Sequence, residues 1–247
     1  MASWATIQFR SESIQKHDAM NVIIPDGAGP FPVLYLLHGL SDNYSAWQRW
    51  TSIERYASSH KLIVVMPNGH RSWYVNDARP GGLAYEDHII KDVVGYVDRV
   101  LPTIRHRRGR AIAGLSMGGY GAMMLAMKNA DVFSTAVGHS SAFGFARDLK
   151  LERSGLDELQ GSLPRGKYDL FALARKLKRS GDKLAIRFDC GVNDFLIESS
   201  RQFHAHLDKL GIAHEYAEHP GEHNWSYWDA HVPQTLEFVM KHLSSSR

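Results

Sequence analysis

A serine lies between glycines in the segment Gly114-Leu115-Ser116-Met117-Gly118, which has the G-x-S-x-G spacing of a nucleophile on a strand-to-helix turn. Residues 110–113 before it are mostly apolar, like the end of a buried strand, and residues 122–127 after it are strong helix formers. Such a turn raises the serine hydroxyl above the sheet edge, and the helix N-terminus directs free N–H groups toward it. The pentapeptide is common by chance, so the prediction that Ser116 is a nucleophile depends on its partners.

A base and an acid are also required, because a serine hydroxyl is a weak nucleophile near neutral pH. In sheets of this kind the chain order is nucleophile, acid, histidine. Asp194 follows a predicted strand at 184–190, and His223 lies between the last predicted strand, 214–218, and the last predicted helix. We therefore predict that His223 is the base and that Asp194 orients it. The weaker candidates are Asp182, Asp189 and Asp208 for the acid, and His219 and His231 for the base.

Two backbone N–H groups are predicted to bind the oxyanion that forms when a serine attacks an ester carbonyl. One belongs to Met117, directly after the nucleophile, and the other to Leu40, in the loop after a predicted strand at 32–37. Gly39 lets the backbone turn inward at this loop. Aromatic residues also gather in loops predicted to face the site. We expect Gly39, Trp47 and Trp225 to contact the substrate, with core anchoring as the alternative role of the two tryptophans.

The elements that must position these residues can be predicted from hydrophobic patterning. Continuous apolar runs predict buried strands, whereas two alternating segments near the N-terminus predict antiparallel edge strands. Strands that alternate with helices indicate an α/β fold with a mostly parallel sheet, helices on both faces and a site at the carboxyl ends of the strands. The predicted strands lie at 4–10, about 20–25, 32–37, 62–67, 110–113, 134–138, 184–190 and 214–218, and the predicted helices at about 50–58, 85–101, 122–127, 169–178, 198–210 and 228–243.

The length of 247 residues suits one large domain, and we expect residues 1–247 to form it. Residues 141–181 differ in composition from the rest of the chain, because glycines and charged residues interrupt the hydrophobic pattern. We predict that they form a lid or insertion. Residues 68–84 are predicted to be a long surface loop, of the kind that is often functional.

The composition excludes several classes of partner. A net charge of +3 is too mild to indicate nucleic acid or a membrane surface, and no apolar run reaches the roughly 18 residues of a membrane span. The single cysteine, Cys190, excludes an intramolecular disulfide, and with no visible signal peptide we expect a cytoplasmic protein. His204 and His206, with His214, are the candidate metal ligands, but His204 and His206 are two apart on a predicted helix and point to different sides, so no metal is expected. A homo-oligomer stays open.

Four segments together resemble the esterase D-like family of α/β-hydrolases, and are closest in style to its small intracellular tributyrin esterases. These segments are residues 33–39 (VLYLLHG), 114–121 (GLSMGGYG), 190–196 (CGVNDFL) and 221–225 (GEHNW). The resemblance extends along nearly the whole chain in the expected order. It implies the α/β-hydrolase fold, a triad of Ser116, Asp194 and His223, a small-molecule carboxylic ester as substrate, and no cofactor.

The same family contains S-formylglutathione hydrolases, feruloyl and acetylxylan esterases, and mycolyltransferases, so other activities stay open. The loop after His38-Gly39 has no cysteine, a residue that S-formylglutathione hydrolases usually carry there. We therefore expect a carboxylesterase for short-chain acyl esters, with aryl acyl groups and acyl transfer to an alcohol as alternatives. A non-catalytic scaffold is a weaker alternative, because such proteins commonly lose a member of the triad and here all three are present.

Overall fold

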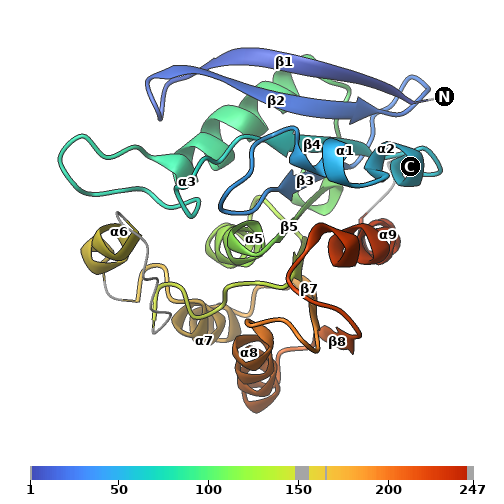
Figure 1. The fold of residues 1–247 in the computed structure, drawn as a ribbon. Helices are drawn as coiled ribbons and strands as arrows, with labels where there is room; N and C mark the ends of the chain where they lie inside the picture. The colour runs from blue at the N-terminus through green and yellow to red at the C-terminus, as the bar shows by residue number, and fades with distance from the viewer. Residues whose placement is uncertain (1, 148–155, 165, 244–247) are drawn as a thin grey trace.

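The computed structural model describes residues 2–147, 156–164 and 166–243 and contains an eight-stranded sheet in the order β1-β2-β4-β3-β5-β6-β7-β8 (Figure 1). The first two strands form an antiparallel hairpin that continues antiparallel onto β4, and the other neighbours are parallel. The strands are β1 (Ser3–Ser11), β2 (Lys16–Ile24), β3 (Val33–Leu37), β4 (Ile63–Pro67), β5 (Arg110–Leu115), β6 (Thr135–His139), β7 (Ala185–Gly191) and β8 (Glu215–His219).

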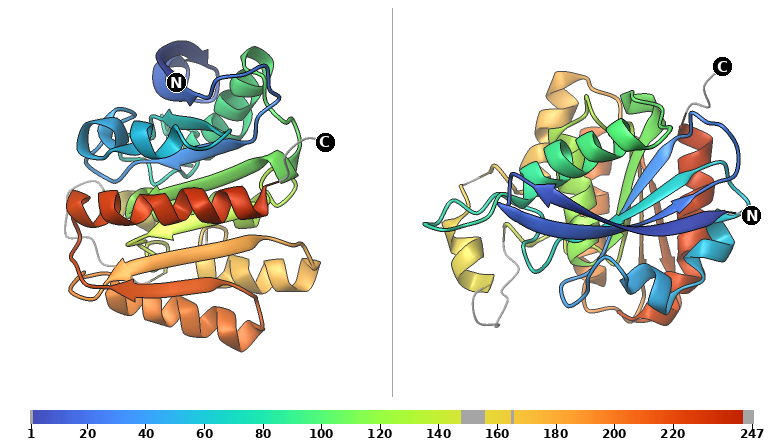
Figure 2. Two further views of the ribbon diagram at one scale, coloured as in Figure 1. Left: turned by 90° about the vertical axis from the view of Figure 1, so that its right-hand side faces the viewer. Right: turned by 90° about the horizontal axis from the view of Figure 1, so that it is seen from above.

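Helices cover both faces of the sheet. On one face lie α1 (Ala46–Trp50), α2 (Ile53–Ala57) and α9 (Trp225–His242), and Figure 2 shows α9 running along the strands. On the other lie α3 (Tyr85–Asp87), α4 (Val94–Val100), α5 (Met117–Lys128), α7 (Leu170–Ser180) and α8 (Ile197–Leu210). A π-helical segment, His88–Val93, joins α3 to α4, a 3₁₀ turn occupies Arg107–Gly109, and α6 spans Leu156–Ser162. This arrangement confirms the predicted α/β-hydrolase class.

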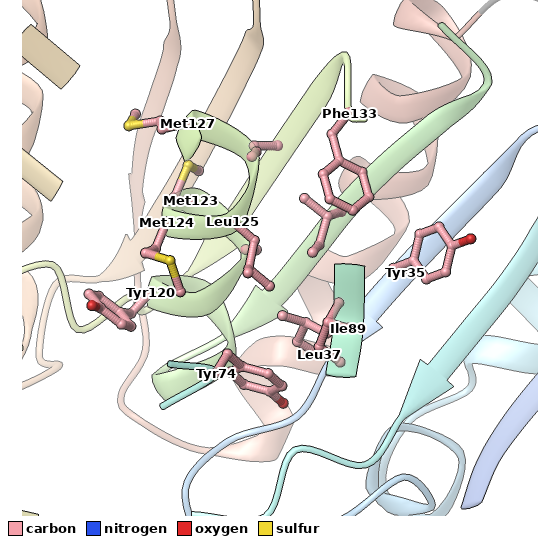
Figure 3. Close-up of a cluster of buried hydrophobic side chains, with 14 of the residues drawn as sticks. Tyr35, Leu37, Tyr74, Ile89, Tyr120, Met123, Met124, Leu125, Met127 and Phe133 are labelled. Atoms are coloured by element: carbon pink, nitrogen blue, oxygen red, sulfur yellow. The ribbon is translucent and has the colours of Figure 1, made fainter. Parts of the chain in front are cut away.

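The central strands are buried on both faces because each face has its own core. Along β3, Tyr35 and Leu37 enter one core, and Leu34 and Leu36 enter the other. The nucleophile helix α5 is buried from its first residue to Met127, and its methionines pack around it in the larger core (Figure 3). This helix is therefore held rigidly against the sheet.

Two helices differ from the sequence-based expectation. The helix predicted at about 50–58 is instead a pair of short helices, because Thr51 between them is extended, with φ −135° and ψ 168°. The last helix begins at Trp225 and not near 228, because the side chain of Asn224 accepts a hydrogen bond from the amide of Tyr227 and caps the helix there. The remaining predicted elements are present, and most end within one or two residues of the expected position. The exceptions are β2, which begins four residues earlier than predicted, at Lys16, and α5, which begins five residues earlier, at Met117.

The region 141–181, predicted to be a lid or insertion, is only partly described. Its second helix, α7, lies against α5 and α8 and buries Leu170, Phe171 and Leu177, so it belongs to the helical layer of the fold. Residues 148–155 and 165 lie outside the described part of the chain, and a lid over this region stays a prediction. Within the described residues no helix is both long enough and apolar enough to cross a membrane.

Candidate active site

Ser116 lies on the turn between β5 and α5 in a strained backbone conformation. Its φ of 53° and ψ of −115° fall in a region that non-glycine residues rarely adopt. The backbone of β6 and of the loop after it holds the turn, since the amide of Ser116 donates to the carbonyl oxygen of His139 at 2.9 Å and its carbonyl accepts from the amide of Ala142 at 3.2 Å. These two hydrogen bonds hold the backbone of Ser116 in its strained conformation.

The two glycines of the motif are required by close backbone contacts. A Cβ at Gly114 would lie 2.5 Å from backbone atoms of Gly118, and one at Gly118 would lie 2.6 Å from the carbonyl oxygens of Leu37 and His38. Real Cβ atoms do not approach backbone this closely. The motif thus lets helix α5 start directly against the ends of β5 and β3.

His223 lies in the loop between β8 and α9 and faces Ser116. Its Nε2 lies 3.0 Å from the serine Oγ, and its Nδ1 lies 2.8 Å from Oδ2 of Asp194. A carboxylate only accepts hydrogen bonds, so Nδ1 carries the hydrogen and Nε2 of the neutral ring is free to accept from the serine hydroxyl. The ring is held by edge-to-face contact with Trp228 at 5.0 Å between centroids and by tilted contact with Phe195 at 4.5 Å.

Asp194 is buried in the loop after β7, where its second oxygen accepts from the amide of Leu196 at 2.8 Å. Burial by itself would raise the pKa of this carboxyl group. The hydrogen bond and charge of His223, with the Leu196 amide and the Ser140 hydroxyl, outweigh burial and hold the pKa of Asp194 below its ordinary value. Asp194 is therefore ionised near pH 7, where it can stabilise a positively charged imidazole.

The loops that carry the acid and the base are bonded to each other. The amide of Asn193 donates to the carbonyl of Gly221 at 3.0 Å, and that of Val192 donates to the carbonyl of His219 at 2.9 Å. Gly221 has a φ of 143°, which favours glycine, and a Cβ there would lie 2.6 Å from the Tyr227 ring. The three predicted residues Ser116, His223 and Asp194 thus come from three separate loops and are joined by hydrogen bonds.

The segments that carry the two predicted oxyanion donors both lie near Ser116. The amide of Met117 is the first of α5, where helical N–H groups lack intrahelical acceptors. The loop of Gly39 and Leu40 passes close by, since a Cβ at Gly39 would lie 3.9 Å from the Cβ of Ser116. The start of α5 and this loop therefore both border Ser116, and the roles of Met117 and Leu40 as oxyanion donors stay predictions.

The sequence interpretation missed the role of His38, which is buried directly before this loop. Its Nε2 accepts from the amide of Gly69 at 2.8 Å, so Nδ1 carries the hydrogen and donates to the carbonyl of Gly39 at 2.7 Å. Tyr74 donates its hydroxyl to the His38 carbonyl at 3.0 Å. Burial lowers the pKa of His38 to about 4, so the ring is neutral near pH 7.

A buried polar network below the site was also missed. His139 at the end of β6 pairs with Asp189 of β7 at 2.9 Å, and its other nitrogen lies 2.7 Å from Oγ1 of Thr235 in α9. Tyr227 donates to Asp189 at 2.9 Å. The signal was the polar run His139-Ser140-Ser141 at the carboxyl end of a predicted strand.

Of the two tryptophans predicted to contact substrate, only Trp225 is partly exposed. Trp47 is 1% exposed, and its indole N–H donates to the carbonyl of Leu37 at 3.0 Å. The prediction that Trp47 contacts substrate does not fit this burial, because the indole is already enclosed between β3 and its neighbours. Trp225 packs edge-to-face on Trp47 at 5.4 Å, so Trp47 supports it from below.

Cys190 is buried at the end of β7 and carries no chemistry at neutral pH. Burial, together with the charge of Asp194, raises the pKa of its thiol to about 12. The thiolate needed for nucleophilic attack is therefore negligible.

Comparison with known proteins gives relatives over the whole chain. The family model described as "Putative esterase" matches residues 11–239. An acetyl esterase of Caldicellulosiruptor saccharolyticus is 27% identical over 259 residues, which covers 95% of this chain and 97% of that protein. The Staphylococcus aureus fluorophosphonate-binding serine hydrolase FphF superposes with a TM-score of 0.89 at 31% identity, covering 96% of this chain and 98% of that one. The S-formylglutathione hydrolase FrmB of Staphylococcus aureus gives 0.87 at 31% identity, with 97% and 99% covered.

Proposed function

The chain belongs to the putative esterase family and is a serine esterase with the α/β-hydrolase fold, and we propose that it hydrolyses short-chain carboxylic esters through an acyl-enzyme on Ser116. The observation that carries this assignment is the hydrogen-bonded chain from Ser116 Oγ through His223 to Asp194, with distances of 3.0 and 2.8 Å. A nucleophile, a base and a group that orients the base are the minimum that serine acyl transfer requires.

In the first half-reaction, Ser116 Oγ attacks the ester carbonyl carbon while its proton passes to Nε2 of His223. The amide groups of Met117 and Leu40 stabilise the negative charge that develops on the carbonyl oxygen. Collapse of the tetrahedral intermediate breaks the bond to the alcohol oxygen, which takes the proton from His223 as the alcohol leaves. Asp194 stabilises the imidazolium in between.

In the second half-reaction, His223 removes a proton from water and the water oxygen attacks the acyl-enzyme. The acid leaves when the bond to Ser116 Oγ breaks and the serine regains its proton. No step requires a metal or an organic cofactor, because the proton and the acyl group are the only groups transferred.

The preference for short acyl groups is supported by the acetyl esterase relative, which the chain matches along almost its full length. The relative that hydrolyses S-formylglutathione makes a thioester of a one-carbon acid the alternative substrate. The two are distinguished by comparing kcat/KM for acetyl and butyryl p-nitrophenyl esters with kcat/KM for S-formylglutathione. A higher value for the thioester would replace the proposed ester substrate while leaving the nucleophile unchanged.

The test of the mechanism is Ser116→Ala, assayed with p-nitrophenyl butyrate. Turnover is expected to fall by about 10⁵-fold or more, since the nucleophile supplies most of the rate above binding and oxyanion stabilisation. Ser134→Ala is the matched control and is expected to keep full activity. Ser134 directly precedes β6, at the end of this strand away from Ser116. Circular dichroism checks that both variants are folded. Substantial turnover by folded Ser116→Ala would refute the mechanism.

A further inference from the structure

Two histidines and an aspartate meet at the end of β8 opposite to His223. His204 and Asp208 lie on α8, and His214 directly precedes β8. Each side chain offers one ligand atom, and these three atoms lie within 4.8 Å of one another. Imidazole nitrogen with one carboxylate is a donor set that first-row divalent metals prefer.

The tautomer of His214 gives its outer nitrogen a lone pair, which is what a metal ligand requires. Its Nδ1 lies 2.8 Å from the carbonyl oxygen of Ile212, which only accepts, so Nδ1 carries the hydrogen and Nε2 presents a lone pair. That Nε2 accepts a hydrogen bond from Nδ1 of His204 at 2.7 Å, and a bound ion would take the place of this hydrogen. A backbone carbonyl that holds the remote nitrogen in this way is the usual support for a metal-ligating histidine. The His214 side chain is only 3% exposed, so its position is fixed.

The rings are also held by stacking. His214 stacks on Phe188 at 5.6 Å between centroids with 6° between the planes, and His204 stacks on Tyr216 at 4.6 Å with 28°. Both partners belong to strands of the sheet, Phe188 to β7 and Tyr216 to β8. The two imidazoles are thus oriented by the fold itself, and an ion would not have to pay for ordering them.

The end of helix α8 brings the third ligand into place. Asp208 lies one turn after His204, with a carboxylate oxygen 3.4 Å from Nε2 of His204 and another 4.0 Å from Nε2 of His214. Gly211 has a φ of 62°, and the amide groups of Gly211 and Ile212 donate to the carbonyls of Asp208 and Leu207. This Schellman-type turn reverses the chain and returns His214 to the helix end.

We propose that His204, Asp208 and His214 bind one divalent transition-metal ion, with Zn²⁺ as the best match to the donor set. Zinc lies about 2.0–2.1 Å from imidazole nitrogen, so two ligating nitrogens in a tetrahedral site are about 3.3 Å apart. The two rings need to separate by only about half an ångström to reach this spacing. The exposed side of Asp208 leaves room for water to complete the shell.

The sequence-based expectation of no metal considered His204, His206 and His214 and did not include Asp208. His206 points away from His204, as predicted, because its Nε2 lies 2.9 Å from the carbonyl oxygen of Phe171. His206 therefore serves as a matched control, since its removal takes one imidazole from the same helix without removing a proposed ligand.

The proposed ion would join α8 to the start of β8, the elements that lead out of the acid loop and into the base loop. Because a ligand that binds only the folded state raises stability, Zn²⁺ is expected to raise the unfolding temperature. It is not expected to take part in ester hydrolysis, because the cluster lies at the end of β8 opposite to His223. The proposal is therefore independent of the proposed function.

The test is isothermal titration of the full chain with Zn²⁺, with Co²⁺ as a spectroscopic probe. One ion per chain is expected to bind tightly, and the visible absorption of bound Co²⁺ should report nitrogen and oxygen ligands. His204→Ala is expected to weaken Zn²⁺ binding at that site by at least about tenfold. Asp208→Asn, an exposed substitution that cannot disturb the core, is expected to weaken it as well, and His206→Ala to leave it unchanged.

Thermal unfolding with and without Zn²⁺ gives the second readout, and circular dichroism checks that each variant is folded. The Zn²⁺-dependent rise in Tm is expected in the original protein and in His206→Ala and should disappear in His204→Ala. The proposal would be overturned if folded His204→Ala and Asp208→Asn bound Zn²⁺ as tightly as the original protein does, because the ion would then occupy another site. Failure of the original protein to bind Zn²⁺ or Co²⁺ would overturn it equally.

Discussion

Nδ1 of His38 donates to the carbonyl oxygen of Gly39 across 2.7 Å, and this bond sets the direction of the next amide group. In a planar trans peptide the N–H points opposite to the C=O, so fixing the Gly39 carbonyl also fixes the N–H of Leu40. Leu40 N–H is one of the two proposed oxyanion donors. His38 is therefore a positioning residue that acts through the backbone.

Replacing His38 with alanine should lower kcat by about 10- to 100-fold and leave KM nearly unchanged, because the Leu40 amide matters most in the transition state. Asparagine can donate from a similar position, so His38→Asn should recover part of the loss. Steady-state kinetics on p-nitrophenyl butyrate measure both parameters. A change confined to KM in the alanine variant would contradict the positioning role.

The same residue predicts a pH dependence of stability. The pKa of His38 is about 4 when folded, compared with 6.5 as the ordinary value, so between these limits the unfolded chain binds more protons. Its contribution is fully present above pH 6.5 and is lost as the pH falls toward 4. The loss in the free energy of unfolding amounts to about 3 kcal/mol.

Urea unfolding at several pH values between 4 and 7 measures this slope. His38→Asn removes the titrating group and should flatten the slope over this window. The exposed His17→Asn on β2 is the control and should not change it. An identical slope in the His38 variant and the original protein would show that burial of His38 is not the cause.

Replacing glycine with alanine is expected to have opposite effects at Gly118, in the turn that carries Ser116, and at Gly95, in helix α4. Gly118→Ala would force a Cβ to within 2.6 Å of two backbone oxygens, so the variant should lose both stability and activity. Gly95 in α4 is exposed and has no atom within 4 Å of its would-be Cβ, so Gly95→Ala should stabilise the fold by up to about 1 kcal/mol. Unfolding temperatures of the two variants measure these effects. A Gly118→Ala variant as stable as the original protein would contradict the close backbone packing at this turn.

Trp47 and Trp225 should separate packing from substrate contact. Trp47→Phe removes the indole donor to the Leu37 carbonyl and should lower stability by about 1–3 kcal/mol, with KM little changed. Trp225→Ala should raise KM for aryl esters more than it lowers stability, because Trp225 adjoins His223 and is partly exposed. The reverse pattern, with KM sensitive only to Trp47, would restore the original prediction for that residue.

What the sequence could predict depends on how local each signal is. Ser116, Asp194 and His223 each follow a strand that the hydrophobic pattern makes visible, and parallel strand ends meet at one sheet edge. The roles of His139 and Asp189 could not be predicted, because they are 50 residues apart and pair only through the β6–β7 register. The burial of Trp47 likewise depends on how α1 packs, which composition does not encode.

The cluster of His204, Asp208 and His214 shows the same limit. Helical spacing places Asp208 beside His204, but the third member depends on the left-handed turn at Gly211. A glycine at a helix end predicts that the chain reverses there. It does not predict where a residue three positions later will lie.

The central claim is that Ser116 is the nucleophile of a serine esterase, and labelling with a fluorophosphonate probe tests it most directly. Phosphonylation should reach one group per chain, peptide mapping should locate it at Ser116, and ester hydrolysis should fall in proportion to labelling. Full labelling at a different residue, or undiminished hydrolysis by protein labelled at Ser116, would contradict the account.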